Sequence, residues 1–160
     1  MRIGVTGHVM LADGTATLVY RSLTEALRPH AADLHGVTCL ANGADQLFAR
    51  AVHALNGTFE VVLPAADYRR AVIGPRERPV FDRLLKRAAA VSYMPFDTSG
   101  PDAYLAASEE MLRRVDRLFA VWDGEPSETA GSTADVVRRA ARLGVPVTVF
   151  WPDGAQRRPA

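Results

Sequence analysis

Short apolar runs alternate with amphipathic stretches along most of the chain. The apolar runs are rich in β-branched residues and predict six buried strands, at residues 2–6, 37–40, 59–63, 90–94, 117–122 and 145–151. Between the strands, apolar residues recur at near-helical spacing, as Leu47, Ala51 and Leu55 do. This period predicts five helices, at residues 16–34, 44–55, 75–89, 103–114 and 133–143.

Strands that are apolar throughout and alternate with helices predict a parallel sheet, because each crossover helix must bury its apolar stripe against a face of that sheet. We therefore expect an α/β domain over residues 1–151, with a single doubly wound, mainly parallel, Rossmann-like sheet and helices on both faces. The polar residues 152–160 are expected to form a mobile tail. Ligands of such sheets bind beyond the carboxyl ends of the strands, which directs attention to the loops that lead from a strand into a helix.

Composition narrows the class of protein. With 160 residues, 48% of them hydrophobic, one domain with one core is expected. The net charge of +1 creates no field that would attract nucleic acid or a membrane surface. The single cysteine, Cys39, cannot form an intramolecular disulfide, and no apolar run is long enough to span a bilayer. We expect a soluble, cytoplasmic protein.

Several common catalytic motifs are missing from the sequence. No G-x-G-x-x-G follows the first predicted strand, and no G-x-x-x-x-G-K-[ST] occurs, so the usual dinucleotide and P-loop fingerprints are absent. The histidines at 8, 30, 35 and 53 lack metal-ligand spacing, and no G-x-S-x-G precedes a helix. We expect no metal site and no required cofactor.

Three strand-to-helix loops are rich in small residues, at positions 6–8, 41–45 and 127–135. The first turn of a helix leaves N–H groups unpaired, and glycine lets a phosphate approach the main chain. The loops therefore predict a shared phosphate site; its candidate residues are Gly7, His8, Gly43, Ala44, Asp45, Gly131, Ser132 and Thr133. The alternative is that the glycines only form turns and that Ser132 or Thr133 caps a helix.

Other candidate residues follow the strands. His8 could donate to a phosphate or base, and Asp45 could accept from ribose hydroxyls, although a turn histidine and an N-terminal cap explain them equally well. After the third strand, Tyr68 could stack on a base and Arg69 could pair with a phosphate, or Arg69 could simply be solvated. Asp123 ends the fifth strand beside the loop at 127–135.

Four segments stand in a characteristic order: "RIGVTGH" at the start, "LANGADQLFARA" at 40–51, "VVLPAADYRR" at 61–70, and "DRLFAVWDG…AGSTADVV" at 116–137. Together they resemble the SLOG superfamily of Rossmann-like nucleotide-binding domains, which includes the LONELY GUY-type phosphoribohydrolases and the domains of DNA-processing protein A. The resemblance extends to about residue 151. It implies binding of a nucleotide or nucleotide derivative, and a homodimer formed through helices that flank the sheet.

The last segment matches the family's G-T-x-x-E signature at a helix start. By position, Gly131 matches the glycine, Ser132 the threonine and Asp135 the glutamate. The resemblance implies close approach of a ligand at Gly131, phosphate contacts from Ser132 and the neighbouring Thr133, and contact of Asp135 with a ribose hydroxyl or a catalytic water. A purely structural role, in which Asp135 complements the helix dipole, is the alternative.

The sequence departs from the hydrolases of this family at one position. They carry an Arg-Lys pair on the helix before the penultimate strand, where this chain has Ala107 and Ser108. Arg113 and Arg114 lie about 9 Å further along that helix and cannot simply substitute. A hydrolase without this pair should lose much of its transition-state stabilisation.

The sequence thus favours a domain that binds a nucleotide or nucleotide derivative, as a sensor, carrier or regulatory domain. The first alternative is a nucleoside 5′-monophosphate phosphoribohydrolase that uses Asp135 as its catalytic residue. The second is a module that binds single-stranded DNA. The near-neutral charge makes nucleic acid an unlikely partner, although the arginines at 69, 70, 76 and 78 could form a local patch.

Overall fold

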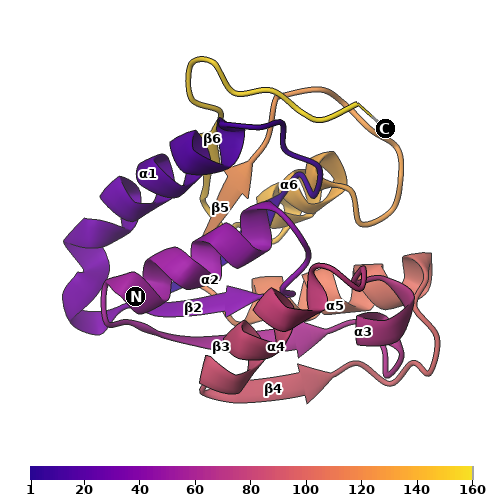
Figure 1. Cartoon of the computed structure of the whole chain (residues 1–160). Coiled ribbons are helices and arrows are strands. Elements are labelled where there is room, and N and C mark those ends of the chain that lie inside the picture. The colour runs from indigo at the N-terminus through magenta and orange to yellow at the C-terminus, as the bar shows by residue number, and fades with distance from the viewer. Residues whose placement is uncertain (160) are drawn as a thin grey trace.

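Six parallel strands form one sheet at the centre of the molecule, as Figure 1 shows for the computed structural model, which describes residues 1–159. The strands are β1 (Arg2–Gly7), β2 (His35–Thr38), β3 (Thr58–Leu63), β4 (Ala90–Tyr93), β5 (Arg117–Val121) and β6 (Val147–Phe150). Their order across the sheet is β4-β3-β2-β1-β5-β6, and each neighbouring pair is parallel.

Helices cover both faces of the sheet. They are α1 (Thr15–Leu27), α2 (Ala44–Ala54), α3 (Tyr68–Ala71), α4 (Arg78–Arg87), α5 (Pro101–Arg113) and α6 (Thr133–Arg142), with a 3₁₀ helix, η1 (Arg28–Asp33), after α1. Helices α1, α2 and α4 lie on one face, and α5 and α6 lie on the other (Figure 1). The predicted doubly wound parallel sheet is therefore confirmed. Among residues 1–159, no helix is both long and apolar enough to cross a membrane.

The winding of the chain changes direction between β1 and β5. From β1 the chain adds β2, β3 and β4 on one side, whereas β5 and β6 lie on the other. The helix that follows β1 covers one face and the helix that follows β5 covers the opposite face. The loops that leave these two strands therefore part in opposite directions and leave a crevice between them. Open α/β sheets bind ligands at such a topological switch point.

The core has a layer on each side of the sheet. Phe48, Phe59 and Phe81 are fully buried on the α2 side. Met111 and Leu118 are buried on the α5 side. Because both faces of the four inner strands, β1, β2, β3 and β5, are covered, these strands read as nearly continuous apolar runs, which is why their positions could be predicted.

The helices differ from the prediction in three places. The helix expected at 16–34 ends at Leu27 and continues as η1, because Pro29 has no N–H to donate to the preceding turn and its ring crowds that turn. The helix expected at 75–89 begins only at Arg78, after a turn at residues 74–77. The short helix α3 was not expected, because its four residues are too few to show a period.

The segment after β6 packs on the loop between β1 and α1, as the yellow end of the chain in Figure 1 shows. Ala12 N–H donates to the Gln156 carbonyl over 2.9 Å, and Arg158 N–H donates to the Met10 carbonyl over 2.9 Å. These bonds tie the expected tail, as far as residue 159, to the switch point. Its mobility stays a prediction, and Ala160 lies outside the described residues.

Candidate functional site

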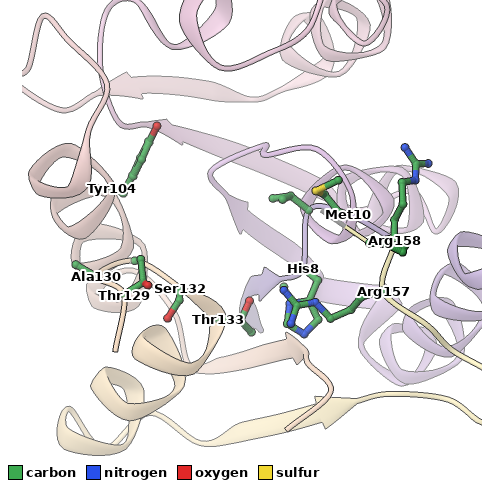
Figure 2. A pocket seen from close by; sticks show the side chains of 13 residues that line it. His8, Met10, Tyr104, Thr129, Ala130, Ser132, Thr133, Arg157 and Arg158 are labelled. Carbon is green, nitrogen blue, oxygen red and sulfur yellow. The ribbon is translucent and has the colours of Figure 1, made fainter. Parts of the chain in front are cut away.

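A cleft of about 590 Å³ lies at the switch point, and we call it the outer cleft. Three segments form its walls: residues 7–10 after β1, residues 129–133 before α6, and residues 157–159 of the tail; Tyr104 of α5 completes it. Figure 2 shows Thr129, Ser132 and Thr133 on one side and His8, Met10 and Arg157 on the other.

A second cavity of about 300 Å³ adjoins the outer cleft, and we call it the inner pocket. Both cavities are lined by Gly7, Val9, Tyr104, Gly131 and Thr133. The inner pocket then continues between α2, α3 and α5, where Asp45, Tyr68 and Ser108 line it. One elongated ligand could therefore occupy both.

The first turn of α6 opens into the outer cleft. Ser132 is the N-cap of the helix, and its hydroxyl accepts a hydrogen bond from Asp135 N–H over 3.2 Å. The N–H groups of Thr133 and Ala134, the first two of the helix, have no acceptor among residues 1–159. They point out of the helix end, where the dipole is positive, so the loop offers two unused donors to an anion.

Asp135 shapes this loop instead of facing either cavity. Its Oδ2 accepts from Gly131 N–H over 2.8 Å and from Arg139 Nε over 3.0 Å, and its Oδ1 accepts from Arg138 over 3.3 Å. Burial by itself would raise the pKa of Asp135, but the Gly131 hydrogen bond and the two arginines hold it below its ordinary value. Asp135 is absent from both linings, so its predicted contact with ribose or water gains no support from the geometry.

The opposite wall carries a neutral histidine and a cation. The His8 ring meets Trp151 edge-on at 5.5 Å between ring centroids, and its Nε2 lies 3.2 Å from Asp123 N and from Asp123 Oδ1. Burial and then the charge of Arg157 lower the pKa of His8, so the ring is uncharged at neutral pH. Arg157 reaches the other Asp123 oxygen over 3.4 Å, and 52% of its side chain is exposed. Its guanidinium is therefore held loosely at the cleft.

The start of α2 is partly capped: the N–H groups of Asp45 and Gln46 have no acceptor among residues 1–159, but that of Ala44, the first of the helix, is engaged. Ala44 N–H donates to the His8 carbonyl over 3.2 Å. A side chain on Gly43, whose φ is +82°, would come within 2.5 Å of that carbonyl oxygen. Gly7 fits against the same helix start, because a Cβ there would lie 2.5 Å from the Cβ of Ala44. These small residues let loop and helix pack closely, which is the structural alternative considered for them.

The inner pocket contains a buried acid. Asp45 is only 5% exposed, its Oδ2 accepts from Ala41 N–H over 3.2 Å, and the Thr38 hydroxyl also bonds to the carboxyl group. Burial raises the pKa of Asp45 to about 7, although both hydrogen bonds oppose the rise. A carboxyl group that titrates near neutrality inside a cavity is a common feature of functional sites.

The structure thus places the predicted site residues in different parts of the molecule. The outer cleft takes Gly7, His8, Gly131, Ser132 and Thr133, and the inner pocket adds Asp45 and Tyr68. Asp123 lines neither cavity but holds His8 and Arg157 in place. Arg69 lies elsewhere, with two hydrogen bonds of 2.7 Å to the Asp82 carboxylate on the surface.

Sequence reasoning missed Arg157, Arg158 and Tyr104, which also line the outer cleft. The arginine pair in the tail was a usable signal, because guanidinium groups commonly bind phosphates. Tyr104 carried no such signal, since it is one aromatic residue in an amphipathic helix. Among residues 1–159, no three His, Cys, Asp or Glu side chains are grouped so that they could hold a metal ion.

The sheet order and the crevice define a Rossmann-like fold, and solved structures of DNA processing protein A, a member of the superfamily that the sequence resembles, share it. DNA processing protein A from Streptococcus pneumoniae has a similar structure, with a TM-score of 0.69 and 14% identity over 96% of this chain and 51% of that one. The molybdenum cofactor binding protein from Rippkaea orientalis gives a TM-score of 0.61 and 15% identity over 95% of this chain and 77% of that one.

A structure of DNA processing protein A from Helicobacter pylori, described for its single-stranded DNA binding mode, gives a TM-score of 0.68 and 12% identity over 98% of this chain and 68% of that one. This chain spans about half the length of the S. pneumoniae protein. No family model and no curated protein matches the sequence. At these identities the comparisons show the fold, and they give no support to excluding nucleic acid as a partner.

Proposed function

We propose that this protein binds a nucleotide or nucleotide derivative across the switch point, with its phosphate in the outer cleft at the start of α6. The observation that carries this proposal is the pair of unused N–H donors on Thr133 and Ala134, beside a cleft that also holds Arg157. Helix N-termini bind phosphate through such donors. The hydroxyls of Thr129 and Ser132 supply further polar contacts at the same place.

Arg157 is suited to respond to a phosphate. Its contact with Asp123 is long, at 3.4 Å, and half exposed, so the ion pair contributes little to stability. A phosphate with two negative charges at the helix start attracts the guanidinium more strongly than Asp123 does, because it offers several oxygens in place of one.

A binding role suits the site better than hydrolysis of the N-glycosidic bond. Ala107 and Ser108, which stand where the related hydrolases have an Arg-Lys pair, line the inner pocket and bring no charge to it. Asp135 is engaged by Gly131, Arg138 and Arg139. A carrier, sensor or regulatory domain needs neither the Arg-Lys pair nor a free carboxylate at Asp135. The fold similarity to a molybdenum cofactor binding protein is compatible with a carrier.

The test compares ligands with and without phosphate by isothermal titration calorimetry. We expect nucleoside 5′-monophosphates to bind at least about tenfold more tightly than the matching nucleosides, since one charge-assisted hydrogen bond is worth about 1.5–3 kcal/mol. Arg157→Ala should remove most of that advantage. Arg142→Ala, at the far end of α6, is the matched control and should leave it unchanged. Equal affinity for nucleosides and monophosphates would overturn the proposal.

Binding of single-stranded DNA is the second candidate, favoured by the structural similarity to DNA processing protein A. Of the arginines at 69, 70, 76 and 78, Arg69 pairs with Asp82 and Arg78 donates to main-chain carbonyls, including that of Ile73, so half of the expected patch is already engaged. Fluorescence anisotropy with a labelled oligothymidylate tests this candidate. Binding that weakens steeply with salt would support it.

We also propose that the protein is a cytoplasmic homodimer. Apolar side chains are exposed beside both edge strands: Val91 and Tyr93 on β4, and Leu143 and Val149 next to and on β6. Exposed apolar side chains at a sheet edge are suited to an interface with a second copy of the chain. Light scattering coupled to size-exclusion chromatography measures the molar mass, and a value near the 17.3 kDa of one chain would refute the dimer.

A further inference from the structure

The inner pocket contains two hydroxyl groups without a partner. Tyr68 is 3% exposed and Ser108 is 9% exposed, and both line the pocket. Neither hydroxyl has a hydrogen-bond partner among residues 1–159, and since no fully buried side-chain oxygen or nitrogen of these residues lacks a partner, both hydroxyls are accessible from the pocket. Each hydroxyl can donate one hydrogen bond and accept others, so both are available to a polar ligand that enters the pocket.

Asp45 supplies the third polar group of the pocket, and its carboxyl group is the one that selects most strongly between ligands. Its carboxyl group accepts from Ala41 N–H and from the Thr38 hydroxyl, and no cation among the described residues pairs with it. An ionised carboxylate can accept about four hydrogen bonds, so two acceptor positions remain. Adjacent N–H groups of a ligand would satisfy them.

Apart from Thr6, Cys39 and Thr133, the rest of the pocket is apolar, and the pocket is small. Val5, Val72, Met111 and the ring of Tyr104 line it. Its volume of about 300 Å³ is at the lower end of the usual range for small-molecule sites. A flat heterocycle with polar groups on its edge fits this combination better than a sugar, which carries hydroxyls in all directions.

We propose that the inner pocket holds the heterocycle of the ligand, and that this heterocycle is a 2-amino-4-oxopyrimidine ring such as that of guanine or a pterin. Asp45 accepts from the ring N–H and the neighbouring 2-amino group, while Tyr68 and Ser108 donate to acceptor atoms elsewhere on the ring edge. This inference rests on the proposed function, because the phosphate of the same ligand lies at the start of α6. Gly131 and Thr133, which line both cavities, stand between the two parts.

This arrangement discriminates between bases by hydrogen-bond pattern. Hypoxanthine keeps the ring N–H but lacks the amino group, and adenine presents a ring acceptor to Asp45. Xanthine places a carbonyl oxygen where the amino group of guanine stands, so it is repelled by the carboxylate. Each wrong partner leaves a buried polar group unpaired, which lowers affinity by about ten- to a hundredfold.

The experiment measures the affinities of GMP, IMP, XMP and AMP for the wild type and for Asp45→Asn by calorimetry. We expect the wild type to bind GMP about ten- to a hundredfold more tightly than the other three. An asparagine amide can accept from the ring N–H and donate to a carbonyl, so Asp45→Asn should weaken GMP and strengthen XMP. Equal affinities in the wild type, or an unchanged order in the variant, would overturn the inference.

Two further measurements separate the possible causes of failure. Binding of inorganic pyrophosphate depends on the α6 loop and Arg157 in the outer cleft and not on the inner pocket. If it persists while the bases are not distinguished, the inference fails and the proposed function stands. Loss of both pyrophosphate binding and discrimination between bases would refute the inference and the proposed function together. Tyr68→Phe, which removes only the hydroxyl, should weaken GMP about tenfold without affecting pyrophosphate, whereas Tyr93→Phe on the exposed edge of β4 should change neither. The affinities of a phosphorylated pterin and of GMP are then compared, and the one that binds more tightly shows whether the ring is a pterin or guanine.

Discussion

Replacement of the buried Asp45 by asparagine should change how the stability of the protein depends on pH. The carboxyl group titrates near 3.8 when unfolded, and burial raises its pKa to about 7 in the folded chain. Between these values the folded protein binds more protons than the unfolded one, so the unfolding free energy falls as pH rises. At about 1.4 kcal/mol per pH unit, the difference between 3.8 and about 7 amounts to about 4 kcal/mol.

The assay is urea unfolding of the ligand-free protein, followed by the fluorescence of Trp122 and Trp151. Asparagine has nearly the shape of the protonated acid and can still accept from Ala41 N–H, so the variant should fold. Relative to the wild type, Asp45→Asn should gain about 3 kcal/mol between about pH 5 and about pH 8, because most of the titration lies in that interval. All other groups titrate alike in both proteins and cancel in the difference. A difference that does not change with pH would refute the argument that Asp45 is buried without a compensating charge.

Three other substitutions test the loops around the site. Gly7→Ala should destabilise the protein by about 1–3 kcal/mol in urea unfolding, since the new Cβ would lie 2.5 Å from the Cβ of Ala44; wild-type stability would show that the two segments can separate. Ser132→Ala removes the N-cap of α6 and should lower stability by about 1 kcal/mol, with a matching fall in the thermal midpoint; no fall would mean that the cap is dispensable. Asp135→Asn should reduce the loss of stability at acid pH, because the folded pKa of this group is depressed and its contribution disappears as pH falls through that value. Incubation of the wild type with nucleoside monophosphates should release no free base, and release that Asp135→Asn abolishes would instead support hydrolysis.

Much of the fold could be predicted because the signals for it are local. A strand buried on both faces must be apolar throughout, and a helix that packs on a sheet must repeat its apolar residues at the helical period. The end of the first helix was predicted wrongly, because the apolar period was followed past Pro29, whose missing N–H ends the α-helix where η1 begins. The four residues of α3 were missed because a single helical turn is too short to show a period.

The candidate site could be predicted only in part. The glycine-rich loops were correctly placed at the carboxyl ends of the strands, since parallel strands bring those ends to one edge. The helix starts differ in one respect, because the His8 carbonyl accepts the first N–H of α2, whereas the first N–H of α6 has no acceptor among residues 1–159. That difference depends on which segment crosses in front of each helix.

The sequence by itself determined the sheet, the helices and the loops that can reach a ligand, because apolar period, glycine and helix-capping residues act over a few neighbouring positions. Only the tertiary structure decided which polar groups are left without partners. Asp135 and Asp45 both stand in the first turn of a helix, yet one is neutralised by Arg139 and the other is enclosed near Tyr68 and Ser108 without a cation. The burial and the charge of a site depend on segments that are distant from one another in the chain. No local sequence pattern could therefore distinguish Asp45 from Asp135.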